Sequence, residues 1–288
     1  MNLKKIISGV AIAMLIVSCN KNETEEKTIS QDDASVSAKI DMANDDVANI
    51  VDDQYENMNT NTFANKSIET PFSQCAVITR VPAFGTPLVA GDLVTKTIDF
   101  GTGCTLSNGN VVKGKIVITF TYQPTATSQT INYQFVNFYH NAIKLEGNKT
   151  FTRTMVAETA TTLAHPIVVM NMDLYAIFPN GNVYHRVGTR TREIIEGIGT
   201  PALLDNVYKI TGSWTTTYPN ATTMSSSITT PLHIKMNCMA VNKPLIVFGV
   251  ITFVRNNTTA TLDYGNGDCD NTAQFTVNGN SYTVVIGN

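Results

Sequence analysis

Apolar and polar residues alternate along most of the chain from Cys75 to the C-terminus, and this pattern restricts the possible folds more than any other feature. In residues 115–122, isoleucine, isoleucine, phenylalanine and tyrosine occupy every second position, with valine and threonines between them. Successive side chains of a β-strand point to opposite faces, so the pattern predicts a strand with one buried face. Residues 131–135 repeat it. The fold is therefore expected to be mainly β.

Turn signals between the strand patterns predict a large antiparallel β meander. Asn-Gly pairs at 108–109, 180–181 and 278–279 are typical of hairpins, because both central residues of a type I′ turn need positive φ. Residues 245–254 are apolar at nearly every position, which predicts a strand covered on both faces. We expect about a dozen strands, in a curled sheet or a two-sheet sandwich, with one N-terminal amphipathic helix. No long linker divides residues 70–288, so residues 33–288 are expected to form a single domain.

Residues 33–56 have the periodicity of a helix. Apolar residues recur at steps of three and four, and Asp or Glu residues fill the opposite face. Asp32 or Asp33 is placed to cap the start of the helix. We expect the apolar stripe to pack against the β domain, where it would also cover residues 245–254; an oligomer contact is the alternative. The stripe consists of Ile40, Ala43, Val47, Ile50, Val51 and Tyr55.

The first 18 residues are typical of a secretory signal peptide. Lys4 and Lys5 precede the largely apolar residues 6–17, which are too few for a membrane-spanning helix of about 20 residues. The ending Ile-Val-Ser-Cys19 resembles a lipobox, which implies cleavage before Cys19 and attachment of two or three fatty chains to it. Two or more chains give stable membrane anchoring. The alternative is an ordinary secreted protein in which Cys19 is incidental.

Residues 19–32 are predicted to form the lipidated cysteine and a flexible acidic tether. The polar segment with Glu23, Glu25 and Glu26 cannot bury enough apolar surface to fold. An acidic run just after the lipid cysteine resembles the signal that exports lipoproteins of Bacteroidota to the cell surface. We therefore expect a protein anchored to the outer membrane through Cys19, either on the periplasmic face or at the cell surface.

The charge distribution excludes nucleic-acid binding. Only 15% of residues are charged, while Thr and Asn are abundant, which suits β-sheets with threonine-lined solvent faces. Residues 20–58 hold 11 acidic and 3 basic side chains, a net charge of −8. Residues 59–288 hold 12 acidic and 15 basic side chains, a net charge of +3. A charge of +3 over a whole domain is far below the basic footprint of a nucleic-acid-binding protein.

Four cysteines besides Cys19 belong to a repeated unit. Residues 95–104 and 259–269 both read Thr-x-Thr-aliphatic-Asp-aromatic-Gly-x-Gly before a cysteine, with one Asp inserted in the second copy. Each copy has a second cysteine upstream, 29 residues before the first and 31 before the second. We interpret residues 75–122 and 238–288 as two copies of one supersecondary unit.

The repeat favours one disulfide pairing. An even number of cysteines outside the cytoplasm indicates disulfides, and four cysteines allow three pairings. If each unit closes on itself, Cys75 pairs with Cys104 and Cys238 pairs with Cys269.

Ordered motifs spread over residues 35–288 carry a family resemblance. They read Thr-Ile-Asp-Phe-Gly-Thr-Gly-Cys (97–104), Lys-Gly-Lys-Ile-Val-Ile-Thr (113–119), Asn-Phe-Tyr (137–139), Lys-Leu-Glu-Gly-Asn-Lys-Thr (144–150), Val-Tyr-Lys-Ile-Thr-Gly-Ser (207–213) and Ile-Thr-Thr-Pro-Leu (228–232). In this order they resemble a family of Bacteroidota lipoproteins of unknown function. The resemblance implies a lipoprotein and supplies no catalytic residues.

Asp263, Asp268 and Asp270 are candidate metal ligands because they crowd one glycine-rich loop. Calcium takes six to eight oxygen ligands, and aspartates at such spacing supply them. The loop is short, however, does not match an EF-hand, and retains only Asp99 in the first copy of the unit. The preferred interpretation is a tight turn in which Asp99 and Asp263 accept backbone N–H bonds, so we expect no metal site.

Tyr184, Arg186, Arg190 and Arg192 are candidate ligand-binding residues on one face of an alternating strand. Guanidinium groups bind phosphate and carboxylate through two parallel hydrogen bonds, so this stripe could hold an anionic glycan or a lipid head group. The preferred interpretation is a solvated strand face that also discourages edge-to-edge aggregation.

No motif indicates catalysis. The four histidines lack zinc-like spacing, and there is no Gly-x-Ser-x-Gly sequence. We therefore expect a non-catalytic binding or structural module of the outer membrane, without a cofactor, whose ligand is a glycan, a protein or a lipid. One alternative is a carrier of lipids or other apolar ligands with a half-open β-barrel. A less favoured alternative is a hydrolase acting on surface polymers.

Overall fold

The structure, a computed structural model, describes residues 28–57, 72, 75–200 and 202–287. The predicted signal peptide, Cys19 and residues 20–27 of the predicted tether lie outside the described residues, so these predictions stay untested.

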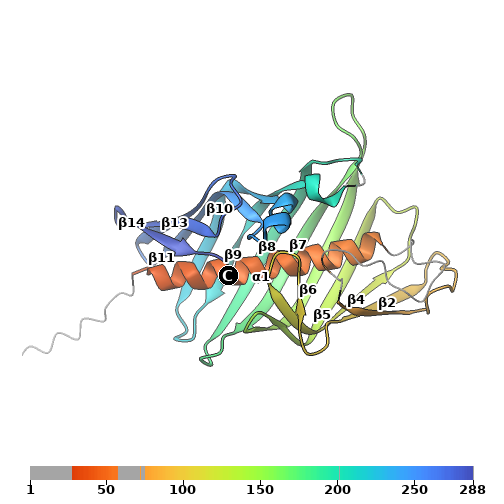
Figure 1. Cartoon of the computed structure of the whole chain (residues 1–288), viewed down its shortest axis with the longest axis horizontal. Helices are drawn as coiled ribbons and strands as arrows, with labels where there is room; N and C mark the ends of the chain where they lie inside the picture. Colours follow the sequence, from red (N-terminus) through yellow and green to blue (C-terminus); the bar gives the residue numbers. More distant parts are fainter. Residues whose placement is uncertain (1–27, 58–71, 73–74, 201, 288) are drawn as a thin grey trace, which may run out of the picture.

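The described strands form one antiparallel sheet of fourteen strands (Figure 1). Along the sheet the strands follow their order in the chain, from β1 at one edge to β14 at the other, and only β3 lies off this path, paired with β4. This confirms the predicted antiparallel meander and decides for a single sheet over a two-sheet sandwich. The strands are β1 (Val77–Val81), β2 (Leu93–Asp99), β3 (Cys104–Thr105), β4 (Val111–Thr121), β5 (Ser128–His140), β6 (Ile143–Val156), β7 (His165–Ile177), β8 (Val183–Glu196), β9 (Val207–Thr217), β10 (Thr223–Lys235), β11 (Ile246–Arg255), β12 (Thr258–Asn266), β13 (Thr272–Val277) and β14 (Asn280–Val285), with short 3-10 helices η1 (Leu203–Asp205) and η2 (Met236–Val241).

The predicted helix is present as α1 (Gln31–Glu56), but it begins two residues earlier than expected and has a different cap. The Ser30 hydroxyl accepts from the backbone N–H of Asp33 at 3.2 Å, and the Asp33 carboxylate accepts from the backbone N–H of Ser30 at 2.9 Å. This capping box satisfies N–H groups that the first turn leaves without helical partners. Ile29 is also buried, so at least this residue of the segment predicted to be tether belongs to the folded domain.

α1 crosses one face of the sheet (Figure 1). Its first turn lies beside β11, where Arg255 donates a hydrogen bond to Asp33 at 2.9 Å. Its last turn lies beside β2, where the Lys96 ammonium donates to the Gln54 carbonyl at 2.8 Å. The helix therefore ties together strands that are far apart in the sheet.

Over residues 43–52 the whole circumference of α1 is buried. Sixteen of its 26 residues are buried, including every residue from 43 to 52. The apolar stripe lies in the hydrophobic core, which confirms packing against the β domain. The acidic face is buried as well, with Asp41 fully covered and Asp45, Asp46 and Asp52 under 9% exposed. Buried carboxylates need partners, and the sheet supplies them.

The other face of the sheet confirms the threonine-lined surface that composition indicated. The strand registers place one Thr, Ser or Asn from each of twelve strands on a single line across the sheet. All twelve are exposed or half-exposed, so the row faces solvent. The row consists of Thr95, Thr119, Asn132, Thr150, Asn171, Thr189, Ser213, Ser227, Thr252, Thr261, Thr276 and Ser281.

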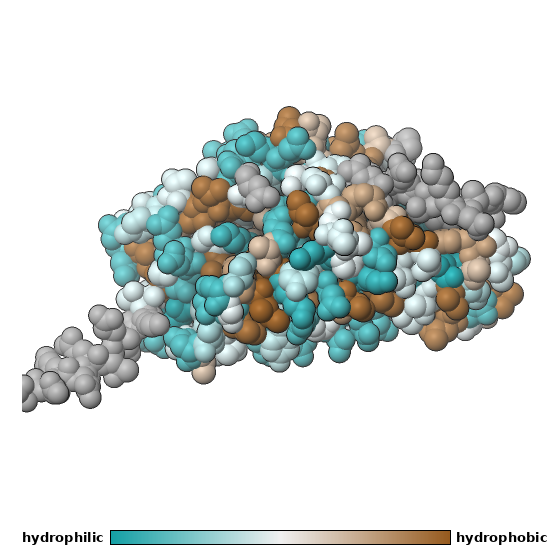
Figure 2. All heavy atoms as spheres, turned by 60° about the horizontal axis from the view of Figure 1, so that its bottom comes forward, coloured by the Kyte–Doolittle hydropathy of each residue, from teal (hydrophilic) through white to brown (hydrophobic). Residues whose placement is uncertain are grey.

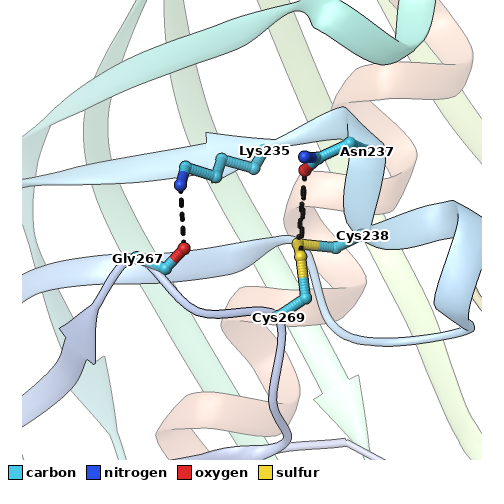
Figure 3. The surroundings of a disulfide bond; sticks show 5 residues. All are labelled: Lys235, Asn237, Cys238, Gly267 and Cys269. Carbon is cyan, nitrogen blue, oxygen red and sulfur yellow. Dashed lines mark hydrogen bonds between the residues drawn. A yellow bond between two sulfur atoms is a disulfide. The ribbon is translucent and has the colours of Figure 1, made fainter.

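Both disulfides have the predicted pairing, Cys75–Cys104 and Cys238–Cys269. In each unit the first cysteine precedes one strand of a hairpin and the second follows its partner strand, β1–β2 in the first unit and β11–β12 in the second. An antiparallel hairpin returns the chain to the end where it began, which brings the two cysteines together. Figure 3 shows the second bridge, between η2 and the segment after β12.

The repeated Asp-aromatic-Gly sequence makes the same side-chain hydrogen bond in both units. Asp99 accepts a hydrogen bond from the backbone N–H of Gly101, and Asp263 accepts one from Gly265, both at 2.9 Å. The aromatic residues between them, Phe100 and Tyr264, are buried. The predicted hydrogen bonds of Asp99 and Asp263 are confirmed, but only the first copy forms a turn. In the second copy β12 continues to Asn266, and the motif lies where the pairing of β12 with β11 shifts register.

Two local predictions need correction. All three Asn-Gly pairs lie in turns between strands, but only Asn278 and Gly279 both have positive φ; at 108–109 and 180–181 the glycine alone does. Residues 245–254 were predicted to be covered on both faces, yet Val254 is 43% exposed. β11 is buried on the face that meets the helix and is partly open on the other, because α1 covers only one face of the sheet.

Candidate functional site

The candidate ligand residues of β8 face α1 instead of solvent. Arg186 and Arg190 are each 1% exposed, and Tyr184 and Arg192 are 8% exposed. The prediction of a solvated strand face is therefore wrong. The two buried arginines bind carboxylates of the helix, so they are not available to hold an anion from solution.

Asp41 is the centre of this buried ion-pair network. One carboxylate oxygen of Asp41 accepts hydrogen bonds from both Arg186 and Arg190. Arg190 also donates to Asp45 at 3.2 Å. Because Asp41 and Asp45 are four residues apart, they lie on the same face of the helix and can share this arginine. The ring of Trp214 from β9 covers the pair, with its centroid 4.2 Å from the Arg190 guanidinium carbon.

Two buried groups between α1 and the sheet, Asp45 and Lys149, have strongly shifted pKa values. Burial raises the pKa of Asp45 from 3.8 to about 6, although Arg190 opposes the shift. Burial, aided by Arg190, lowers the pKa of Lys149 from 10.5 to about 7. The Lys149 ammonium, on β6, donates to the Asn44 side chain of α1. The interface between helix and sheet therefore holds groups that change charge near neutral pH.

Asp45→Asn should change the dependence of stability on pH. The pKa of Asp45 is higher in the folded protein than in the unfolded chain, so the folded state binds the proton more tightly. The contribution of this proton to the free energy of unfolding is therefore complete below about pH 3.8 and is lost as the pH rises through 6. Asparagine does not titrate. From pH 4 to pH 7.5 the variant should therefore gain up to about 3 kcal/mol relative to the wild type.

Urea unfolding of both proteins at the two pH values measures this gain. The control is Asp268→Asn, which changes an exposed aspartate in the same way and should show no comparable gain. A stability difference between Asp45→Asn and wild type that is equal at both pH values would contradict the prediction.

Asp46 binds a different part of the sheet. Its carboxylate lies 2.7 Å from His140 Nε2 and accepts from the side-chain amides of Asn108 at 2.7 Å and Asn110 at 2.8 Å. All four side chains are buried. These contacts connect the middle of α1 to the β3–β4 turn and to the end of β5, so the role of this cluster is structural.

Two of the candidate metal ligands, Asp263 and Asp270, accept nearby backbone N–H groups. Asp263 accepts the Gly265 N–H, and Asp270 accepts the Thr272 N–H at 2.8 Å. Within the described residues, no group of three or more His, Cys, Asp or Glu side chains is arranged to hold a metal ion. The structure thus does not bring Asp263, Asp268 and Asp270 together as a metal centre.

An open cleft of ≈ 730 Å³ lies at the N-terminal end of α1, and Tyr184 is the predicted site residue that lines it. The start of α1 forms one wall, and the tips of the β7–β8 and β9–β10 hairpins form another. The end of β11 closes the cleft. The lining residues are Thr28, Ser30, Asp33, Asn182, Tyr184, Tyr218, Pro219, Asn220, Thr222 and Arg255.

The two hairpin tips on the rim of the cleft share one sequence pattern. Residues 178–182 read Phe-Pro-Asn-Gly-Asn, and residues 218–222 read Tyr-Pro-Asn-Ala-Thr. In both five-residue tips, the backbone N–H of the first residue donates to the carbonyl of the fifth residue. The backbone N–H of the fourth residue donates to the carbonyl of the first residue. All four distances are 2.8–2.9 Å. In both, the central Asn side chain accepts the N–H of the fifth residue, at 3.0 and 3.2 Å. Proline and these side-chain bonds hold the rim in one conformation.

The floor of the cleft combines two tyrosines with an ion pair. Tyr184 and Tyr218 pack edge to face, with ring centroids 5.3 Å apart. The Arg255 guanidinium lies over the Tyr218 ring at 4.2 Å and donates to both carboxylate oxygens of Asp33, at 2.9 and 3.3 Å. Burial raises the pKa of both tyrosines, so their hydroxyls stay protonated at physiological pH. The charges of Arg255 and Asp33 neutralise each other, and the two tyrosine hydroxyls are uncharged. The floor of the cleft therefore has no net charge.

Sequence reasoning missed most of this cleft. The repeated aromatic-Pro-Asn pattern at 178–180 and 218–220 was a signal that could have paired the two hairpin tips. No local signal could have found Arg255, because its partner Asp33 lies 222 positions away. For the buried arginines, the net charge of −8 in residues 20–58 was a signal that the helix needs cationic partners.

The carrier alternative receives little support. α1 crosses the face of the sheet that would hold an apolar ligand (Figure 1). Its Asp41 forms buried ion pairs with Arg186 and Arg190 of that face. A largely apolar cavity beside Met42, Ile143 and Ile286 has a volume of ≈ 230 Å³, below the roughly 300–1,000 Å³ of most ligand pockets. On the side shown in Figure 2, hydrophobic residues form groups that hydrophilic residues interrupt.

Within the described residues, no helix combines the length and apolar character needed to cross a membrane. Comparisons of the chain with models of protein families, with curated proteins and with solved structures give no match.

Proposed function

We propose that this chain is a lipid-anchored, non-catalytic binding module of the outer membrane, and that the cleft at the N-terminal end of α1 is its ligand site. The cleft itself is the observation that carries the proposal. Its volume of ≈ 730 Å³ lies within the range of ligand pockets. Its rim and floor are held by turns, a capping box and an ion pair before any ligand arrives, which lowers the entropy lost on binding.

The chemistry of the cleft supports binding over hydrolysis. Glycoside hydrolysis generally uses two carboxyl groups, one on each side of the bond that breaks. Asp33 is the one acidic residue among the lining residues, and Arg255 engages both of its oxygens. A carboxylate so engaged is a poor general base.

The predicted anchor would hold the cleft close to the membrane. Thr28, which lines the cleft, lies nine positions after Cys19. Nine extended residues span at most about 30 Å. A lipid on Cys19 would therefore keep the cleft within that distance of the bilayer, where components of the envelope are concentrated.

Two measurements on cells that express the full chain test the proposal. For the anchor, an alkyne-tagged fatty acid should label the wild type, and Cys19→Ser should lose both the label and membrane association.

For the cleft, a photoreactive benzoylphenylalanine in place of Asn182 should cross-link to an envelope component. The same residue in place of Asn171, which is exposed on the opposite face of the sheet, is the control. Retained label in Cys19→Ser would refute the anchor, and equal cross-linking at both positions would refute the cleft.

A further inference from the structure

The cationic group of the cleft is already in use within the protein. Both terminal nitrogens of Arg255 donate to Asp33, so no guanidinium fork is free for a phosphate or carboxylate. The start of α1 does not offer an anion site either, because the Ser30–Asp33 capping box occupies its first N–H groups. Asp32, in the same turn, adds a negative charge. These features disfavour an anionic ligand.

The aromatic and acidic groups of the cleft do not suit a cationic ligand. A cation binds best over the face of an aromatic ring. Arg255 already lies over the Tyr218 ring at 4.2 Å. The Asp33 carboxylate, which would neutralise an incoming cation, is paired with the same arginine.

The rim of the cleft does not suit an apolar ligand. Asn182, Asn220 and Thr222 come from the two hairpin tips, and Thr28 and Ser30 come from the start of α1. Each of these side chains carries amide or hydroxyl groups that donate and accept hydrogen bonds. The Ser30 and Thr222 hydroxyls already bond within the protein, to Asp33 and Asn220. An apolar ligand would still remove the other amide and hydroxyl groups of the rim from water, which is unfavourable.

We infer that the cleft binds a neutral saccharide. A sugar presents uncharged hydroxyls that both donate and accept, which matches the amides and hydroxyls of the rim. It also presents C–H groups, which can contact the small part of each tyrosine that remains open, 8% of Tyr184 and 9% of Tyr218. This inference rests on the proposed function, since it names the ligand class of the same cleft.

Affinity electrophoresis of the full chain in detergent tests the inference. The gels contain a neutral polysaccharide (dextran, mannan or xylan) or an anionic one (alginate or dextran sulfate). We expect at least one neutral polysaccharide to retard the wild type, and the anionic ones not to. Asn182→Ala and Tyr184→Phe each remove one hydrogen-bonding group from the cleft and should weaken the retardation about fivefold to tenfold.

Matched controls separate the cleft from the rest of the surface. Asn171→Ala and Tyr175→Phe make the same changes on β7, at exposed residues that do not line the cleft, and should leave retardation unchanged. Retardation only by anionic polysaccharides, if weakened by the cleft variants, would overturn the inference that the ligand is neutral while leaving the cleft as the binding site. Retardation that the cleft variants do not affect would overturn the cleft as well. If none of the five polymers retarded the protein, the inference of a neutral saccharide would be overturned. The cross-linking experiment at position 182 would still test the proposed function separately.

Discussion

Asp41→Asn is expected to lower the free energy of unfolding by about 3–5 kcal/mol, the range measured when one partner of a buried ion pair is removed. Asp41 is fully buried and accepts from both Arg186 and Arg190, which are themselves buried. Without its charge, two guanidinium groups stay in the core with Asp45 as the neighbouring carboxylate. Urea unfolding at constant pH measures the loss.

A surface ion pair provides the control for Asp41→Asn. Lys115 lies 2.8 Å from Asp99, and their side chains are 46% and 32% exposed. Lys115→Ala should change stability by less than about 1 kcal/mol, because solvent screens the pair. If Asp41→Asn cost no more than this control, the buried network would not hold the helix as described.

Replacing the four charged side chains of the network separates the effect of charge balance from that of packing. The quadruple variant Asp41→Leu, Asp45→Asn, Arg186→Met, Arg190→Met removes both carboxylates together with both of their arginine partners. Well-packed apolar residues often replace a buried ion pair without loss of stability. We therefore expect the quadruple variant to be more stable than Asp41→Asn. A quadruple variant less stable than Asp41→Asn would show that packing around Trp214, and not charge balance, dominates at this site.

Removal of the second disulfide by Cys238→Ala and Cys269→Ala is expected to lower stability by about 3–4 kcal/mol in the chain-entropy model. The bridge joins residues 31 positions apart, so it restricts the unfolded chain considerably. It also ties η2 to the segment after β12, and Cys238 lies in the hydrophobic core. Urea unfolding of the double variant against the oxidised wild type measures the loss.

The first disulfide provides a matched comparison. Its loop of 29 positions is nearly the same length, so Cys75→Ala with Cys104→Ala should cost a similar amount. Wild type kept reduced should lose roughly the sum of the two. An unfolding midpoint that reduction does not change would contradict both predictions, and a large difference between the two double variants would indicate that packing at one bridge matters more than chain entropy.

Features that depend on neighbouring residues could be predicted from the sequence. The two-residue period in residues 115–122 is enough to predict β4, and steps of three and four are enough to predict α1. The disulfide pairing followed from a repeat whose copies each close one hairpin. The hydrogen bonds of Asp99 and Asp263 followed from the same repeat, because an aspartate can accept the N–H two residues ahead without help from the rest of the chain.

The candidate site could be predicted only in part. Tyr184 was identified as a ligand candidate and does line the cleft, but Tyr218, Arg255 and Asp33 were not associated with it. Arg186, Arg190 and Arg192 were placed correctly on one face of a strand, and only their environment was misjudged. Periodicity shows which residues share a face, but it does not show what covers that face.

The sequence by itself determined the elements of this protein, namely the antiparallel strands, the helix, the turns and the cysteine pairs, because each depends on residues close in the chain or on a visible repeat. Only the tertiary structure decided which way the charged faces point. Asp41 and Arg186 are 145 positions apart, and they meet because α1 lies across β8. The same crossing brings Asp33 to Arg255 and thereby forms the floor of the cleft. A buried charge needs an opposite charge beside it, and only the assembled sheet shows which residues provide it.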